Sequence, residues 1–361
     1  MDKLELEGQT VYFASSEHMD AIEDGSVTLV VTSPPYWNVR DYGGDQIGFN
    51  QSYQEYIDAL NQVWAECIRV LQPNGKIAID VQPLPIPGEQ SGFDFRVICD
   101  IMHDVEAFFR ANDCFLSGMN FWNKAAYVNN VSWGSYPKPT NIATNTSFEQ
   151  IYTFVKRGDT RKIPKEVLAG NLLTKDEWRH WAVRCIWDDI APVIKINAKG
   201  ENLYGHGAPF PEEIPYRLMR MHTVKGETVL DPFLGSGTTL KVARLLGRHG
   251  IGFEINGDYE RRIRERILED WTPPAPDEGY ITIGYKTLKK IVVETLGTAA
   301  ERGFSYADKD EFVVATATQL KNDGIISAAV KEKLLGAKAE KSERKRDKKK
   351  DTGKALDKFL D

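Results

Sequence analysis

The residues best suited to chemistry form the hexapeptide TSPPYW at positions 32–37, directly after the β-branched run VTLVV. An amino group on a nucleobase is a weak nucleophile, because its lone pair is delocalised into the ring. The Ser33 hydroxyl and the Pro34 carbonyl can accept its two N–H bonds and so favour attack by the nitrogen. Pro35 completes a rigid pair that holds this carbonyl in place, and Tyr36 can stack on the base. A turn that merely ends a strand is the alternative interpretation.

A second candidate site is the segment DPFLGSGTT at positions 231–239, between an apolar run and a helical pattern. Backbone amides and a helix N-terminus at such a turn can face a ligand. Gly235 and Gly237 allow the backbone to approach that ligand closely. Asp231 can accept hydrogen bonds from an ammonium group, and Phe233 can form an apolar wall.

An acidic residue follows this turn at the distance expected for an adenosine ligand. Glu254 ends the next apolar run, GIGFE, about twenty residues after the turn, where a carboxylate can bind the two hydroxyls of a ribose. A nicotinamide cofactor would use a similar turn, but Leu240 stands where its GxGxxG motif requires the third glycine. The pattern therefore favours an adenosine-containing cofactor without a diphosphate, and an ordinary strand-to-helix turn is the simpler alternative.

The order of the two motifs resembles a known family. TSPPYW followed much later by DPFLGSGTT is similar to the circularly permuted beta group of DNA amino-methyltransferases, in which the catalytic motif precedes the cofactor motif. The similarity covers roughly residues 10 to 270, including HGAPFPEEIPYRLM at positions 206–219. It implies S-adenosyl-L-methionine as cofactor and a double-stranded DNA substrate whose target base is flipped out of the helix.

The resemblance also assigns site residues. Pro209 and Phe210 correspond to residues near the methionine part of the cofactor, whereas Ala14, Ser15 and Ser16 replace a Gly-Asp pair common in the family. The predicted catalytic residues are Ser33, Pro34, Pro35 and Tyr36. The predicted cofactor-binding residues are Thr32, Pro209, Phe210, Asp231, Phe233, Gly235, Ser236, Gly237, Thr238 and Glu254.

The first motif residue bears on the target base. Ser33 resembles the cytosine-N4 members of the family, whereas adenine-N6 members usually carry aspartate or asparagine there. We therefore expect transfer to the N4 amine of cytosine, with N6-adenine as the alternative. A non-catalytic DNA-binding subunit, an RNA methyltransferase and a protein-glutamine methyltransferase remain rival interpretations.

The cysteines exclude one further chemistry. Carbon-5 methylation of cytosine needs a thiolate, usually from a Pro-Cys loop, and none of the four cysteines follows a proline. Their scattered spacing also matches no metal site. We expect reduced thiols at Cys67, Cys99, Cys114 and Cys185.

The periodicity predicts the elements that position these motifs. Strands alternate with helices at both ends of the chain, which indicates an α/β fold with a mainly parallel sheet and helices on both faces, a Rossmann-like methyltransferase core. The predicted strands cover positions 27–31, 76–81, 115–122, 149–156, 228–233 and 249–256. The predicted helices cover positions 52–71, 93–112 and 211–222 and a stretch that ends near 247.

Four regions follow from this organisation. Residues 1–122 would form the catalytic half, 123–200 a core strand with an inserted target-recognition region, 201–272 the cofactor-binding half, and 273–361 an appendage with a basic, disordered tail. Solvated or structural roles are the simpler alternative for each candidate DNA contact in the inserted region. Those candidates are Lys124, Asn129, Asn130, Lys138, Asn141, Asn145, Lys156, Arg157, Arg161, Lys162 and Lys165.

Charge and hydropathy bound the partners. The net charge is −6, and residues 331–361 hold 12 of the 46 Lys and Arg, so the rest of the chain carries 34 basic against 45 acidic residues. A DNA-facing surface must therefore be a local patch. No stretch approaches the ~20 apolar residues that cross a bilayer, so we expect a cytoplasmic protein. A homodimer and a cognate restriction endonuclease are candidate partners.

Overall fold

The computed structural model describes residues 2–38, 46–124, 133–134, 139, 142–193 and 211–274. The chain divides after Pro273 into two units, and all described residues except Pro274 belong to the first. Pro209 and Phe210, and the candidate DNA contacts Asn129, Asn130, Lys138 and Asn141, lie outside the described residues.

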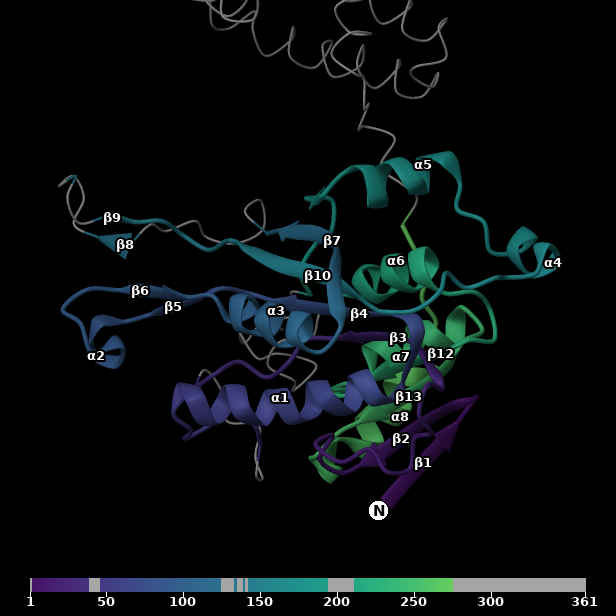
Figure 1. Cartoon of the computed structure of the whole chain (residues 1–361), viewed down its shortest axis with the longest axis horizontal. Helices are drawn as coiled ribbons and strands as arrows, with labels where there is room; N and C mark the ends of the chain where they lie inside the picture. The colour runs from purple at the N-terminus through teal and green to yellow at the C-terminus, as the bar shows by residue number, and fades with distance from the viewer. Residues whose placement is uncertain are drawn as a thin grey trace, which may run out of the picture. The chain divides into compact units, whose positions relative to one another are not determined.

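A nine-stranded mixed sheet forms the centre of this unit (Figure 1). Its order is β1-β2-β13-β12-β3-β4-β10-β7-β11, and β2, β13, β12, β3 and β4 run parallel to one another. Strand β10 is antiparallel to both neighbours, and β1 is antiparallel to β2. The mainly parallel α/β fold is thus confirmed. The strands are β1 (Asp2–Leu6), β2 (Gln9–Phe13), β3 (Val27–Thr32), β4 (Leu71–Val81), β7 (Cys114–Asn123), β10 (Phe148–Lys156), β11 (Ile186–Trp187), β12 (Thr228–Asp231) and β13 (His249–Phe253).

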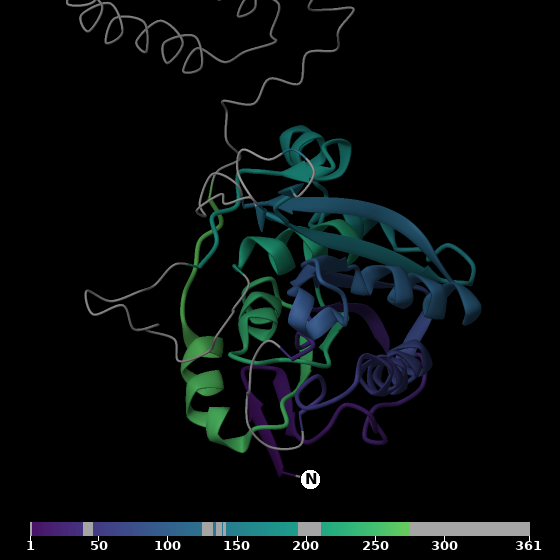
Figure 2. The same ribbon diagram turned by 90° about the vertical axis from the view of Figure 1, so that its left-hand side faces the viewer.

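Alternating side chains of β3 explain why helices cover both faces of the sheet. Val30 packs into one apolar cluster with α1 (Tyr53–Val70) and α3 (Ile101–Ala111). Leu29 and Val31 belong to a second cluster with α6 (Glu213–His222) and α7 (Thr238–Leu245). Every β3 residue is buried, which suits a continuous β-branched run in a parallel sheet covered on both faces. Figure 2 shows α1 and α3 on the opposite side of the sheet from the green α6 and α7.

The remaining elements lie around this core. Helix α8 (Glu260–Leu268) packs with β1 and β2 in a third apolar cluster. Two small antiparallel ladders join β5 to β6 and β8 to β9. None of the described helices is long and apolar enough to cross a membrane. The minor elements are β5 (Leu84–Ile86), α2 (Gly88–Ser91), β6 (Val97–Cys99), β8 (Trp133–Gly134), β9 (Ile142–Ala143), α4 (Lys165–Ala169), α5 (Lys175–Glu177), a π-helix (Trp178–Val183) and a 3₁₀ helix (Gly257–Tyr259).

The direction of winding reverses at one place in the sheet. The unit β12-α7-β13 proceeds from the centre toward one edge, and β3-α1-β4 proceeds toward the other. The carboxyl ends of β12 and β3 therefore meet at a topological switch point, where open α/β sheets bind their ligands. Both motifs of the sequence follow these two strands.

The predicted helix over positions 93–112 is wrong in its first part. Residues 97–99 form β6, whose hydrogen bonds to β5 satisfy the backbone in an extended conformation. The helix α3 begins only at Ile101. Apolar spacing alone did not distinguish the two, because pairing with a strand earlier in the chain decides the conformation.

The inserted region is tied to the core by aromatic residues. Trp187 lies in edge strand β11 and is fully buried, and Trp181 of the π-helix is 5% exposed. Trp178 is exposed. The indole N–H of Trp187 donates to the Trp181 carbonyl at 3.2 Å. Trp181 and Trp187 are thus packing residues of the core.

Two candidate phosphate contacts, Lys156 and Arg161, bond within the protein instead. The Lys156 ammonium donates to the carbonyls of Ile68 and Leu71, each at 2.6 Å. Arg161 forms an ion pair with Glu227. These two side chains stabilise the fold, so the simpler structural alternative holds for them.

Candidate active site

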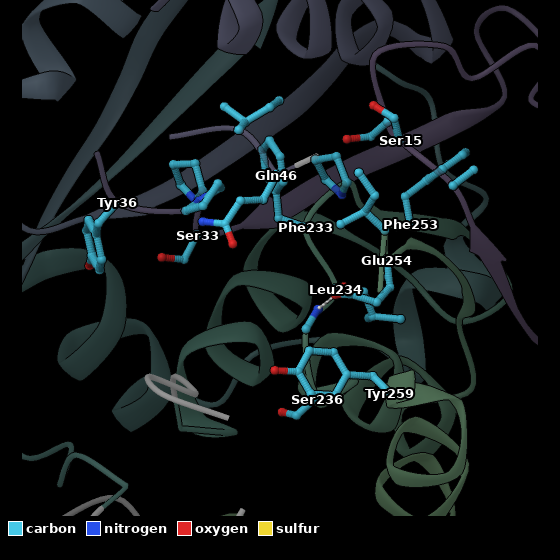
Figure 3. A pocket seen from close by; sticks show the side chains of 18 of the residues that line it. Ser15, Ser33, Tyr36, Gln46, Phe233, Leu234, Ser236, Phe253, Glu254 and Tyr259 are labelled. Atoms are coloured by element: carbon cyan, nitrogen blue, oxygen red, sulfur yellow. Dashed lines mark hydrogen bonds between the residues drawn. The ribbon is translucent and has the colours of Figure 1, made fainter. Parts of the chain in front are cut away.

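One pocket lies at the switch point and is lined by both motifs (Figure 3). Its walls come from the loop after β3, the loop after β12, the end of β13 and the turn after β2. The lining residues are Ala14, Ser15, Ser16, Ser33, Pro34, Pro35, Tyr36, Gln46, Ile47, Pro232, Phe233, Leu234, Gly235, Ser236, Thr238, Phe253, Glu254, Ile255 and Tyr259.

The TSPPYW loop is held from the start of α1. The Tyr56 hydroxyl donates to the Pro35 carbonyl at 2.9 Å, and the Trp37 indole N–H donates to the Gln51 carbonyl at 2.9 Å. Helix α1 begins with a capping box, in which Ser52 and Glu55 satisfy each other's backbone N–H groups. All four predicted catalytic residues line the pocket on this braced loop.

Asp231 joins the two motifs from behind the pocket. Its Oδ1 accepts hydrogen bonds from the Thr32 hydroxyl at 2.7 Å and the Phe233 N–H at 3.0 Å, and its Oδ2 accepts one from the Thr239 hydroxyl at 2.5 Å. Asp231 is 1% exposed and does not line the pocket. Burial raises the pKa of Asp231 to about 6, although the three donors lower it. The structure therefore gives Asp231 and Thr32 a part in joining β12 to β3, and contact with an ammonium group stays a prediction.

Glu254 lies in the pocket wall where β13 ends. Its Oε2 accepts a hydrogen bond from the Gly235 N–H at 2.9 Å, drawn as a dashed line in Figure 3, and its Oε1 accepts one from the Asn256 N–H at 2.9 Å. Burial raises the pKa of Glu254 to about 7, and these backbone donors act in the opposite direction. A carboxylate with remaining lone pairs at this position can accept hydrogen bonds from the hydroxyls of a ribose.

The glycines of the cofactor motif have the left-handed backbone that this turn requires. Gly235 has φ of 54° and Gly237 has φ of 95°, a region disfavoured for residues with a Cβ. Gly237 is the residue before the first turn of α7, so the helix N-terminus opens next to Ser236 and Thr238, which line the pocket. Phe233 also lines it, as the sequence predicts.

The pocket contains residues that sequence reasoning missed. Gln46 lies beside Ser33 in the pocket wall (Figure 3), and Tyr259 of the 3₁₀ helix lines the side near Glu254. Tyr259 follows Glu254 by five positions, a proximity that could have indicated it. Gln46 carries no local motif. Ser15 and Ser16, which replace the Gly-Asp pair common in the family, also line the pocket.

Sequence comparisons agree with this architecture. Residues 27–265 match the family described as DNA methylase, whose name covers N6 and N4 methyltransferases. Type II methyltransferase M.MjaI of Methanocaldococcus jannaschii is 32% identical over 283 residues, which covers 71% of this chain and 90% of that protein. Type II methyltransferase M.MthZI of Methanothermobacter thermautotrophicus is 30% identical, and the match covers 72% of this chain and 76% of that protein.

Structural comparison leads to the same family. The protein TTHA0409 of Thermus thermophilus, solved in complex with S-adenosyl-L-methionine, is similar to this chain with a TM-score of 0.55 and 29% identity. The match covers 72% of this chain and 94% of that one. The family match covers most of the described core, and the two relatives are similar over 71% and 72% of the chain. This chain therefore belongs to the DNA methylase family of N6 and N4 amino-methyltransferases.

Proposed function

We propose that this protein transfers a methyl group from S-adenosyl-L-methionine to the exocyclic N4 amine of a cytosine flipped out of double-stranded DNA. The observation that carries the base assignment is Ser33, which stands at the first motif position and lines the pocket together with the loop after β12. Adenine-N6 members of the family usually have an acid or amide there.

The pocket fits the proposed cofactor by the chemistry of its own residues. Glu254 presents a carboxylate for two ribose hydroxyls, and Gly235 exposes backbone without a side chain. Phe233, Phe253 and Ile255 provide apolar walls for the rest of the molecule. When bound, S-adenosyl-L-methionine supplies an electrophilic methyl group on a sulfonium.

The residues of the TSPPYW loop would prepare the acceptor. The Ser33 hydroxyl and the Pro34 carbonyl accept the N–H bonds of the amine, which leaves the nitrogen lone pair available for attack. Tyr36 stacks on the base, which must leave the duplex to reach the pocket. No protein nucleophile takes part, so catalysis consists of positioning and electrostatic stabilisation.

The relatives named Type II methyltransferases suggest a biological context. We propose that this protein modifies DNA within a restriction-modification system, with a cognate restriction endonuclease as its partner. A homodimer is the expected oligomeric state. Sedimentation of the purified protein, alone and with DNA, would test that part of the proposal.

The test of the base assignment is to incubate the protein with methyl-labelled S-adenosyl-L-methionine and unmethylated duplex DNA, then digest the DNA and identify the labelled nucleoside by mass spectrometry. N4-methylcytosine is the expected product. N6-methyladenine would overturn the cytosine assignment and retain the machinery. Label in RNA but not in DNA would overturn the DNA substrate.

A further inference from the structure

A buried polar cluster contacts the tyrosine of the catalytic motif. The Tyr36 hydroxyl donates to Glu149 Oε2 at 3.2 Å and accepts a hydrogen bond from the Gln82 backbone N–H at 3.3 Å. Lys124 Nζ lies 2.5 Å from Glu149 Oε1 and 2.9 Å from Gln82 Oε1. Gln82, Lys124 and Glu149 do not line the pocket, so they can affect a bound base only through Tyr36.

Asp80, near the end of β4, gives this cluster an unusual charge balance. Asp80 is 2% exposed and, as a carboxylate, finds no hydrogen-bond donor among the described residues. The charged groups that act on it are Glu149 and Lys124. Burial, together with the negative charge of Glu149, holds the pKa of Asp80 well above its usual range, although Lys124 opposes this. Burial of Asp80 beside the Glu149 carboxylate therefore favours the protonated form of Asp80.

A proton on Asp80 would provide one more hydrogen-bond donor for Glu149. A protonated Asp80 can donate to the Glu149 carboxylate, which an ionised Asp80 cannot do. Glu149 accepts from two groups on separate segments, Tyr36 after β3 and Lys124 after β7, and a protonated Asp80 on β4 would add a third donor. Such a network costs more to bury than apolar side chains of the same volume, so stability alone is a weak reason for its presence. Glu149 and the Gln82 backbone N–H contact the Tyr36 hydroxyl directly, and Lys124 reaches it through Glu149.

We propose that Glu149 is a positioning residue for the target base. It anchors the Tyr36 hydroxyl, and Lys124 and the protonated Asp80 hold Glu149 in place. An anchored hydroxyl restricts rotation and tilt of the ring, so the stacking surface is ordered before the base arrives. This inference rests on the proposed stacking of Tyr36 on the flipped base, and it does not depend on which base is methylated.

A double-mutant cycle between Glu149 and Tyr36 tests the coupling. We expect Glu149→Gln and Tyr36→Phe each to lower kcat/KM for duplex DNA about 10-fold, the size of one charge-assisted hydrogen bond. The dissociation constant for S-adenosyl-L-methionine should not change. The double variant should be no worse than either single variant, because both remove the same contact.

Variants of Asp80 and a matched control separate positioning from general stability. Asp80→Ala should lower kcat/KM for DNA, and Asp80→Asn should restore it, because an amide can donate to Glu149 as the protonated carboxyl group does. Glu227→Gln breaks another half-buried ion pair, with Arg161, outside the pocket. Glu227→Gln should lower Tm without changing kcat/KM for DNA or the dissociation constant for S-adenosyl-L-methionine.

The outcomes distinguish the inference from the activity on which it rests. Kinetics are measured as total methyl transfer to DNA, with Tm recorded for every variant. Additive losses in the double variant, or a Glu149→Gln enzyme that behaves like Glu227→Gln, would overturn the positioning role. A wild-type protein that transfers no methyl group to DNA would overturn the activity itself, whatever the variants do.

Discussion

At the scale of the residue, Ser33 carries the assignment of both chemistry and base. Its side chain lines the pocket on a loop braced by α1, so replacement by alanine removes an acceptor and leaves the backbone in place. We expect Ser33→Ala to lower kcat about 100-fold, the effect of losing one hydrogen-bonding group aimed at a transition state. Binding of S-adenosyl-L-methionine, measured by calorimetry, should be unchanged.

A serine at the other end of β3 provides the control for that prediction. Ser26 is exposed and donates to the Glu23 carbonyl at 2.6 Å, outside the pocket. Ser26→Ala should retain the wild-type kcat. Equal kcat values for the two variants would remove Ser33 from the mechanism.

Glu254 should make cofactor binding depend on pH. Its pKa of about 7 means that a substantial fraction is protonated at neutral pH, and a protonated carboxyl group loses acceptor capacity toward ribose hydroxyls. We expect the affinity for S-adenosyl-L-methionine to rise as pH increases from about 6.5 to 8.5. Glu254→Gln should bind more weakly and nearly independently of pH over that range; an unchanged pH profile in this variant would contradict the role.

The same group has the opposite effect on folding stability. Because burial raises the pKa of Glu254 in the folded state above its unfolded value, the folded protein binds more protons between about pH 4.5 and 7. The free energy of unfolding should therefore decrease as pH rises through that window. Urea titrations should show a smaller decrease for Glu254→Gln than for the wild type.

At the scale of the element, strand β13 lies against both the loop after β12, which includes Leu234, and helix α7. A Cβ at Gly250 would come within 2.2 Å of Gln9 Oε1 and 2.9 Å of Leu240 Cγ. A Cβ at Gly252 would come within 2.7 Å of a methyl group of Leu234, which lines the pocket. Glycine is therefore required at these two positions by close packing against different neighbours.

Alanine substitutions at the two glycines should separate stability from binding. Overpacking costs about 1–3 kcal/mol, so both variants should show a Tm lower by several degrees in calorimetry. Only Gly252→Ala should also weaken binding of S-adenosyl-L-methionine, because Leu234 must move. Equal dissociation constants for S-adenosyl-L-methionine in the two variants would show that the contact between Gly252 and Leu234 does not control the loop after β12.

At the scale of the whole molecule, the active site joins distant parts of the chain. Thr32 and Asp231 are 199 positions apart and form a buried hydrogen bond at the switch point. The pocket also takes residues from the turn after β2 and from the end of β13. The permuted order of the motifs is therefore compatible with one site, because parallel strands bring their carboxyl ends to the same edge of the sheet.

The distribution of charge leads to a prediction for DNA binding. Residues 331–361 hold 12 basic and 7 acidic residues, whereas the rest of the chain is acidic. A chain that ends at residue 330 should show a higher KM for DNA at low salt, and the difference should shrink at high salt because the contribution is electrostatic. Its affinity for S-adenosyl-L-methionine should match that of the full chain. Identical KM values at all salt concentrations would mean that these residues are only solvated.

The sequence by itself determined the local parts of this protein. The buried run of β3, the helix α1 with its capping box and the turn before α7 follow from patterns within a few residues, where side-chain period and turn chemistry act directly. The family resemblance added the fold, which the comparisons support, and the permuted order of the motifs, which stays a prediction. Tertiary structure decided the rest, because long-range pairing depends on the order of strands in the sheet. Pairing with β5 gives residues 97–99 the conformation of strand β6, and Asp231 lies behind the pocket. Lys124 pairs with Glu149, which contacts the Tyr36 hydroxyl.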